Sequence, residues 1–345
     1  MLFACFLWKK YSLLVKSFTL DITVVLYYNL LLRKYTSEKG KRSMEKPILT
    51  VYCLTYNHGN YIKKTLEGFV NQKTDYKFKV VVHDDASTDN TAQIIKEYAD
   101  KFPDIISPIF QTENQYSKGV KIVNEFIIPR LEGKYIAICE GDDYWCDENK
   151  IQIQIDYMEN NADCTLCVHN TEYINEDGTG TGRLFNKFNE ERDFTTDEIV
   201  RASDGGAFHL SSFLYRVEDR LSYPSKFYIR GVGDYPMGVY LSTKGRVHYI
   251  NRVMSMYRVM SKGSWTQRIN SSKKSKKKHL KNMLAGINAM DEATEYVYHK
   301  SFVLAEKNQK FAHMNKIQKI LAGVFDHYYR QLLKEKIIKR LTNKK

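Results

Sequence analysis

The sequence has no uninterrupted apolar segment of the roughly 18–20 residues that a membrane-spanning helix needs. Residues 11–32 are largely apolar, but three polar side chains interrupt them: Lys16, Asp21 and Asn29. No small-residue cleavage site follows this stretch, so it is also not typical of a signal peptide. We expect residues 1–44 to be an N-terminal extension, which either lies on a membrane surface or is not part of the working protein.

A clustered cysteine framework is also missing, which counts against a small secreted, disulfide-bonded fold. The six cysteines are scattered through apolar segments, and the closest pair, Cys164 and Cys167, lies in a predicted buried strand. No second close pair accompanies it, so we interpret these two cysteines as structural rather than as a zinc or redox site. This usage favours a reducing compartment, with the protein cytoplasmic or peripheral on the inner face of the membrane.

The middle of the chain has no excess of positive charge, although the formal net charge is +13. Residues 273–345 contain 18 Lys and Arg against 6 Asp and Glu, whereas residues 45–272 carry a charge of −5. A basic groove for nucleic acid is therefore not predicted. With 43% hydrophobic and 13% aromatic residues, the chain is able to bury a large core and is not predicted to be disordered.

What the sequence does contain is an alternation of short apolar strands and longer helices. Strands are predicted at residues 48–53, 78–83, 105–110 and 135–139, and helices at 61–70, through Tyr98 and Ala99, and near 120–131. This alternation indicates an α/β fold with a mostly parallel central sheet flanked by helices. In such sheets, ligands bind beyond the carboxyl ends of the strands.

Polar clusters stand at three of these strand ends. The clusters are Thr55-Tyr56-Asn57, Asp84-Asp85 and Glu140-Gly141-Asp142-Asp143. The carboxylates of the last cluster disfavour one another's ionisation, so a positive partner is expected beside them. Because the carboxyl ends of parallel strands meet at one edge, the sequence predicts a single site there.

Four groups of residues then carry a resemblance that covers residues 46–268. The groups are Thr50–Asn57, Val81–Thr91, Glu140–Asp143, and a later set with Gly233–Pro236, Gly245–Ile250 and Met256–Trp265. Together they resemble family 2 glycosyltransferases of the GT-A fold, and the later set is similar to bacterial members that build surface polysaccharides. The resemblance implies a nucleotide-sugar-binding half at 45–146 and an acceptor-binding half at 147–268, and we expect the remaining residues, 269–345, to form a basic helical tail.

The resemblance also implies a divalent cation, Mn²⁺ or Mg²⁺, between the acidic turn and the diphosphate of a nucleotide sugar. These hard ions prefer oxygen ligands and commonly use one or two carboxylates with phosphates. Asp142 aligns with the last acid of the family's D-x-D motif and is the predicted metal ligand. Glu140 replaces the first Asp and reaches the metal through water or contacts the donor ribose, and Asp143 orients the sugar or its neighbours.

The other strand ends acquire roles by the same resemblance. Asp85, with Asp84 as its neighbour, is expected to hold the uracil or ribose of a UDP-sugar, because a carboxylate accepts hydrogen bonds from both. Thr55 and Tyr56 are expected to pack along the base, with Asn57 in the same donor site. For Tyr56 the alternative is an ordinary core aromatic.

The reaction implied is an inverting transfer of a hexose or N-acetylhexosamine to a hydroxyl of a glycan or lipid-linked glycan. The attacking hydroxyl must lose its proton, and a positioned carboxylate is a suitable general base. Asp234 in Gly231-Val-Gly-Asp-Tyr-Pro236 aligns with the family's catalytic acid and also suits a helix N-terminus. His209 matches a family segment near the acceptor, and its alternative is a structural strand histidine.

The chain departs from the family at one position. Related sequences often carry His two residues after the Tyr-Arg pair, where this chain has Met260, and a thioether is a poor ligand for a hard cation. Arg258 and Lys262 are the expected substitutes for holding phosphate, with Trp265 stacking on donor or acceptor. This departure leaves open a catalytically impaired protein that only binds nucleotide sugars.

The tail lies outside the resemblance. Residues 273–278 are expected to be an exposed basic linker, and apolar residues recur at helical spacing beyond it, from Ile317 to Phe325. Such a helix either lies on an anionic membrane surface or packs in a bundle against the catalytic domain.

Two other enzyme classes are less consistent with the sequence. A glycoside hydrolase would use paired carboxylates without a nucleotide site, and a nucleotidyltransferase would normally show a Gly-rich phosphate loop, which is not found. Release of UDP from UDP-sugars, with and without Mn²⁺, distinguishes these possibilities.

Overall fold

The computed structural model describes residues 46–203, 205–229, 231–259, 267, 269 and 271–342. The predictions for residues 1–44, Lys262 and Trp265, and the substitution at Met260, lie outside the described residues. The elements below belong to one compact unit, Pro47–Lys345.

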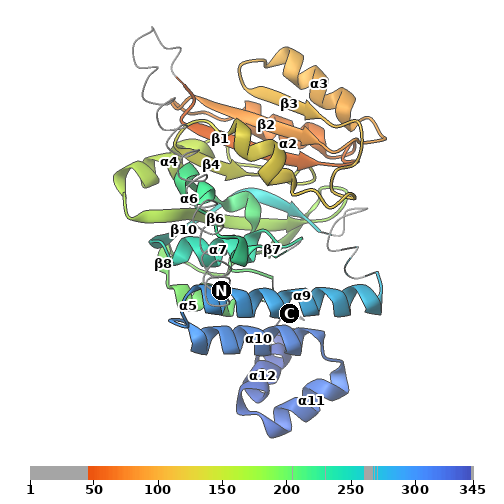
Figure 1. The fold of residues 1–345 in the computed structure, drawn as a ribbon, viewed down its shortest axis with the longest axis vertical. Coiled ribbons are helices and arrows are strands. Elements are labelled where there is room, and N and C mark those ends of the chain that lie inside the picture. The colour runs from red at the N-terminus through yellow and green to blue at the C-terminus, as the bar shows by residue number, and fades with distance from the viewer. Residues whose placement is uncertain are drawn as a thin grey trace, which may run out of the picture. The chain divides into compact units, whose positions relative to one another are not determined.

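The first half of the sheet is parallel, as the alternating pattern predicts. It contains the strands β1 (Leu49–Thr55), β2 (Phe78–Asp84), β3 (Ile106–Phe110) and β4 (Tyr135–Ile138). Their order is β3-β2-β1-β4, and every neighbouring pair is parallel (Figure 1). The helices α2 (Ile62–Val70) and α3 (Thr91–Lys101) connect them. The carboxyl ends of β1, β2 and β4 therefore share one edge.

Both faces of this sheet are buried, because successive strand side chains point to opposite sides. In β1, Leu49, Val51 and Cys53 enter a cluster with the apolar side of α2, while Tyr52 enters a second cluster on the other face. Burial on both faces explains why the strands appear in the sequence as continuous apolar runs rather than as alternating ones.

The second half of the sheet is mixed. It contains the strands β5 (Tyr144–Trp145), β6 (Cys164–Ile174), β7 (Gly180–Leu184), β8 (Arg192–Phe194), β9 (Leu214–Arg216) and β10 (Arg246–Arg258). The sheet continues β4-β9-β6-β10-β5, with β9 antiparallel to both of its neighbours and β6 parallel to β10. Cys164 and Cys167 are buried free thiols in β6, which confirms the structural interpretation, and burial raises the pKa of Cys164 to about 11.

Short helices join these strands. They are α4 (Lys150–Asn160), α5 (Thr196–Arg201), α6 (Val217–Leu221), α7 (Asp234–Ser242) and the single turns η3 (Leu210–Ser212) and η4 (Ser225–Phe227). The helix predicted near 120–131 is instead a π turn, η1 (Val123–Ile127), followed by a 3-10 turn, η2 (Ile128–Arg130). Pro129 lacks the backbone N–H that a continuing α-helix requires.

In the described part of the chain, four helices follow the sheet: α9 (Lys273–Ala293), α10 (His299–His313), α11 (Lys316–Phe325) and α12 (His327–Thr342) (Figure 1). The expected linker at 273–278 is wrong, because these residues form the first turns of α9. Ser272 caps that helix by accepting a hydrogen bond from the Ser275 N–H, and lysine itself has good helix propensity. Met283 and Ile287 of α9 and Phe302 of α10 join the main core, so these two helices are part of the folded unit.

Among the described residues, no helix is both long enough and apolar enough to cross a lipid bilayer.

Candidate active site

The acidic turn after β4 lies against the end of β1. The Gly141 N–H donates to the Leu54 carbonyl (3.0 Å), and a Cβ at Gly141 would lie 2.9 Å from the Thr55 Cβ. Any side chain at position 141 would therefore push the turn away from β1. This close approach fixes where Glu140, Asp142 and Asp143 stand on the sheet edge.

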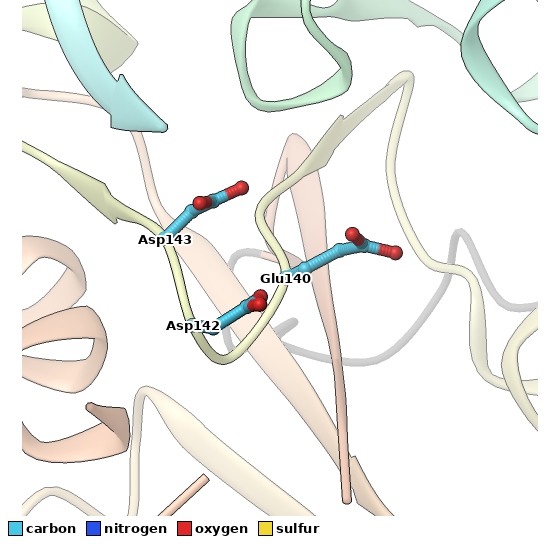
Figure 2. A group of neighbouring side chains, drawn as sticks. All are labelled: Glu140, Asp142 and Asp143. Carbon is cyan, nitrogen blue, oxygen red and sulfur yellow. The ribbon is translucent and has the colours of Figure 1, made fainter. Parts of the chain in front are cut away.

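Glu140, Asp142 and Asp143 form a compact group of oxygen ligands. Each offers a carboxylate oxygen, and these three atoms lie within 4.8 Å of one another. Glu140 is exposed, Asp142 is half-buried and Asp143 is buried. Figure 2 shows the three side chains extending from one tight turn of the chain. We call this group the acidic cluster.

Asp143 is the rigid member of the acidic cluster. Its Oδ1 accepts a hydrogen bond from the Arg258 backbone N–H (2.8 Å), and its carbonyl lies 2.6 Å from the Thr65 hydroxyl. Burial, followed by the nearby charge of Asp142, raises the pKa of Asp143 well above its usual range. An ionised Asp143 therefore needs a positive partner in the cluster.

Arg258 supports the acidic turn from behind. Its Nε donates to the Asp142 carbonyl (3.0 Å), and its Nη1 lies 3.0 Å and 2.6 Å from the carbonyl oxygens of Asn175 and Glu176. The guanidinium also lies 4.6 Å from the centre of the Tyr61 ring. Arg258 thus connects three segments of the chain, and its use in holding phosphate stays a prediction.

A cavity of about 520 Å³ opens beside this arginine. Its lining residues come from the start of α2, the turn between β6 and β7, and the end of β10: Asn60, Tyr61, Lys64, Glu176, Asp177, Gly178 and Arg258. Sequence analysis did not select Tyr61, Thr65 or Glu176. Tyr61 and Thr65 belong to the start of α2, whereas Glu176 follows β6, 115 positions from Tyr61, so no local pattern brings these residues together.

His209 reaches the acidic cluster from a distant segment. Its Nε2 lies 3.7 Å from the Asp143 Oδ2, and its ring stacks on Tyr257 with 4.1 Å between ring centres. Its Nδ1 lies 2.7 Å from the Ser211 hydroxyl oxygen, within hydrogen-bond distance. Burial lowers the pKa of His209 to about 4, so the ring is neutral at physiological pH.

Asp234 stands at the first position of α7, close to the segment that carries His209. The Tyr235 N–H donates to its Oδ1 (2.7 Å), while a Cβ at Gly206 would lie 3.3 Å from its Oδ2. Gly206 therefore lies beside Asp234, and His209, three residues later, lies beside Asp143. Burial raises the pKa of Asp234 to about 6. The short segment 206–209 thus links Asp234 to the acidic cluster.

The predicted donor residues gather at the ends of β1 and β2. The Asp85 carboxylate accepts hydrogen bonds from the backbone N–H groups of Gln115 (2.8 Å) and Tyr116 (3.0 Å), and Asp84 accepts from Ser87. Both carboxylates therefore shape the loops of this edge, and their contact with a nucleotide stays a prediction.

Thr55, Tyr56 and Asn57 lie at the same edge. Tyr56 is 42% exposed, so the core-aromatic alternative is wrong. Asn57 adopts a positive φ of 56° and accepts a hydrogen bond from the Thr88 N–H (2.8 Å), which joins the β1 and β2 loops. The Thr55 hydroxyl is buried without a hydrogen-bond partner among the described residues, which is costly unless a ligand or water supplies one.

The acidic cluster thus stands at the carboxyl edge of a mixed α/β sheet, where ligands of such sheets bind. Residues 50–219, about half of the chain, match the family described as "Glycosyl transferase family 2". The chain belongs to this family.

Two curated relatives extend the comparison. An uncharacterised protein of Mycobacterium tuberculosis is 31% identical over 221 residues, which covers 63% of this chain and 60% of that protein. The Escherichia coli enzyme WfaP, a UDP-Glc:alpha-D-GlcNAc-diphosphoundecaprenol beta-1,3-glucosyltransferase, is 30% identical over 135 residues, covering 39% of this chain and 50% of that one. The chain thus spans 60% of the length of the mycobacterial relative and 50% of the length of WfaP.

A solved structure shows the same fold. The crystal structure of S. aureus TarS residues 1–349 in complex with UDP-GlcNAc has a TM-score of 0.59 and 18% sequence identity. The match covers 76% of this chain and 72% of that chain. The predicted fold class is therefore confirmed, with a sheet that is parallel in its first half and mixed in its second.

Proposed function

We propose that this chain transfers a glycosyl unit, with inversion, from a UDP-sugar to a hydroxyl of a growing surface glycan. The observation that carries the proposal is the position of segment 206–209, which lies beside both Asp234 and the acidic cluster. UDP as the carrier is supported by the names of WfaP and the TarS complex. A hexose or N-acetylhexosamine donor and a lipid-linked acceptor are proposed on the same basis.

The residues of the acidic cluster fit a hard divalent cation such as Mn²⁺ or Mg²⁺. All its ligand atoms are oxygens, and in the described part of the chain Arg258 is the cation that favours ionisation of the buried Asp143. Asp142 and Glu140, the more accessible members, would hold the ion. When bound, the cation stabilises negative charge on the leaving diphosphate. Arg258 and Thr65 keep the turn in place while this charge develops.

Asp234 is proposed as the general base. A carboxylate whose pKa is about 6 is ionised at neutral pH, yet is more basic than an ordinary aspartate, so it accepts the acceptor hydroxyl's proton more readily. The Tyr235 N–H holds Oδ1 and leaves Oδ2 as the oxygen beside Gly206. Transfer then forms the bond from acceptor oxygen to anomeric carbon as the bond to the diphosphate breaks.

The first test is release of UDP from a panel of UDP-sugars, with and without Mn²⁺. We expect slow hydrolysis of one donor, at least about tenfold faster with the cation. The metal is expected to lower the activation free energy by several kcal/mol, because it stabilises the negative charge that develops on the diphosphate. A matched mixture with Ca²⁺ controls for ionic strength. Donor binding without turnover of any UDP-sugar would favour the alternative, a nucleotide-sugar-binding protein that has lost catalysis.

The pH dependence of transfer gives a second prediction. Only ionised Asp234 accepts a proton, so kcat/KM is expected to be flat above about pH 7 and to fall about tenfold per pH unit below pH 6. The measurement is kcat/KM from pH 5 to pH 8 at saturating Mn²⁺. Donor and Mn²⁺ affinities measured at pH 5 separate protonation of Asp234 from loss of binding. A profile that stays flat down to pH 5 contradicts the role of Asp234.

A further inference from the structure

The helix α11 exposes an apolar face that the catalytic site does not use. Its members recur at the spacing of one helix face and are all exposed: Ile317, Ile320, Leu321, Val324 and Phe325. We call these five residues the α11 apolar face. Phe325 is 86% exposed, and within the described part of the chain no element covers the face.

The orientation of this face is fixed by the other side of the helix. Gly323 is buried against α12, where a Cβ would lie 3.4 Å from the Leu333 Cδ2 and 3.5 Å from the Arg330 Cα. The Arg330 Nε donates to the Gly323 carbonyl (2.9 Å). At the start of α11, Asn315 and Gln318 form a reciprocal capping box. Because α11 packs through its small residues, its large apolar side chains point outward (Figure 1 shows α11 beside α12).

A contiguous apolar patch that is ordered and outward-facing marks an interaction surface. The charge around the patch identifies its partner. Residues 314–345 contain nine Lys and Arg against two acidic residues. Lys316 at the start of α11 and Lys334 in the middle of α12 are exposed. A second copy of the chain would bring two such basic segments together, which charge repulsion opposes. An anionic lipid surface attracts the same basic residues and accepts the apolar ones.

We propose that the α11 apolar face inserts into the headgroup region of an anionic membrane. The α11–α12 hairpin then acts as a reversible anchor, with α9 and α10 connecting it to the core. Ile337 and Ile338 of α12 are also exposed and enlarge the apolar surface of the hairpin. This inference does not depend on the transfer reaction, since it rests on the hairpin alone.

The test is sedimentation of the full chain with vesicles. One set contains equal parts of phosphatidylglycerol and phosphatidylcholine, and the other contains phosphatidylcholine only. We expect partition onto the anionic vesicles at least about tenfold above the neutral ones, with a marked decrease in high salt. Phe325→Ser is expected to lower partition onto anionic vesicles about tenfold, and Leu321→Ser combined with Phe325→Ser to abolish it.

Leu221→Ser is the matched control, because Leu221 is an exposed leucine on α6, outside the hairpin. It is expected to bind vesicles as the wild type does. Thermal melting and UDP release in the absence of vesicles should be the same for all variants, which excludes misfolding. Equal partition of wild type and double variant onto anionic vesicles overturns the proposal. So does a wild-type dimer that becomes monomeric only in the double variant, since a second copy would then occupy the face.

Discussion

Asp234→Asn is expected to lower kcat for transfer by about 10²–10⁴-fold while leaving the affinity for the donor within about twofold of wild type. Asparagine keeps the size of the side chain and its hydrogen bond from the Tyr235 N–H, but it does not accept a proton from an attacking hydroxyl. The measurements are transfer kinetics and UDP-sugar binding by calorimetry.

Stability provides a control for this variant. Because burial raises the pKa of Asp234, its carboxylate is less favourable in the folded than in the unfolded protein, and folding stability is lost as the pH rises from about 4 to 6. The neutral amide escapes this loss, so at pH 7.5 the variant is expected to melt no lower than wild type. Transfer within threefold of wild type would remove Asp234 as the base.

Asp142→Ala is expected to abolish the metal-dependent part of turnover, a loss of about 10³-fold if the cation supplies about 4 kcal/mol to the transition state. Asp142 is the accessible aspartate of the acidic cluster, and its loss leaves Glu140 and the buried Asp143. The readouts are UDP release at several Mn²⁺ concentrations and direct Mn²⁺ binding by electron paramagnetic resonance.

Asp104→Ala serves as the matched control for this second variant. Asp104 is an exposed aspartate in the connection between α3 and β3, so its removal changes the net charge equally without altering the acidic cluster. Wild-type Mn²⁺ binding by Asp142→Ala would place the cation elsewhere. Weak binding with normal turnover would show that the reaction proceeds without it.

The fold of the first half was predictable because its signals are local. Strands β1, β2, β3 and β4 are continuous apolar runs, and each boundary carries polar or turn residues. Parallel pairing then places Thr55, Asp84 and the acidic turn on one edge, as the strand order shows. A site at that edge follows from the sequence and from the geometry of parallel sheets.

Other parts depend on contacts that no local pattern contains. His209 lies 66 positions from Asp143 in the sequence, and their approach requires β9 to insert between β4 and β6. The outward face of α11 was likewise open to two interpretations, because periodicity shows that a face is apolar but not what it packs against. Gly323 packs against α12 and so leaves the apolar face of α11 outward, a contact that the periodicity of α11 does not reveal.

The position of Arg258 in the sequence determines when the acidic turn is held in place during folding. The acidic turn is complete in sequence by residue 143, yet the arginine that holds its backbone arrives 115 positions later, on the last strand. A nascent chain that has emerged only as far as β9 already contains every acidic side chain of the cluster. It still lacks Arg258, whose hydrogen bonds hold Asp142 and Asp143 in place. In the proposed enzyme, cation binding is therefore coupled to the addition of β10 to the sheet.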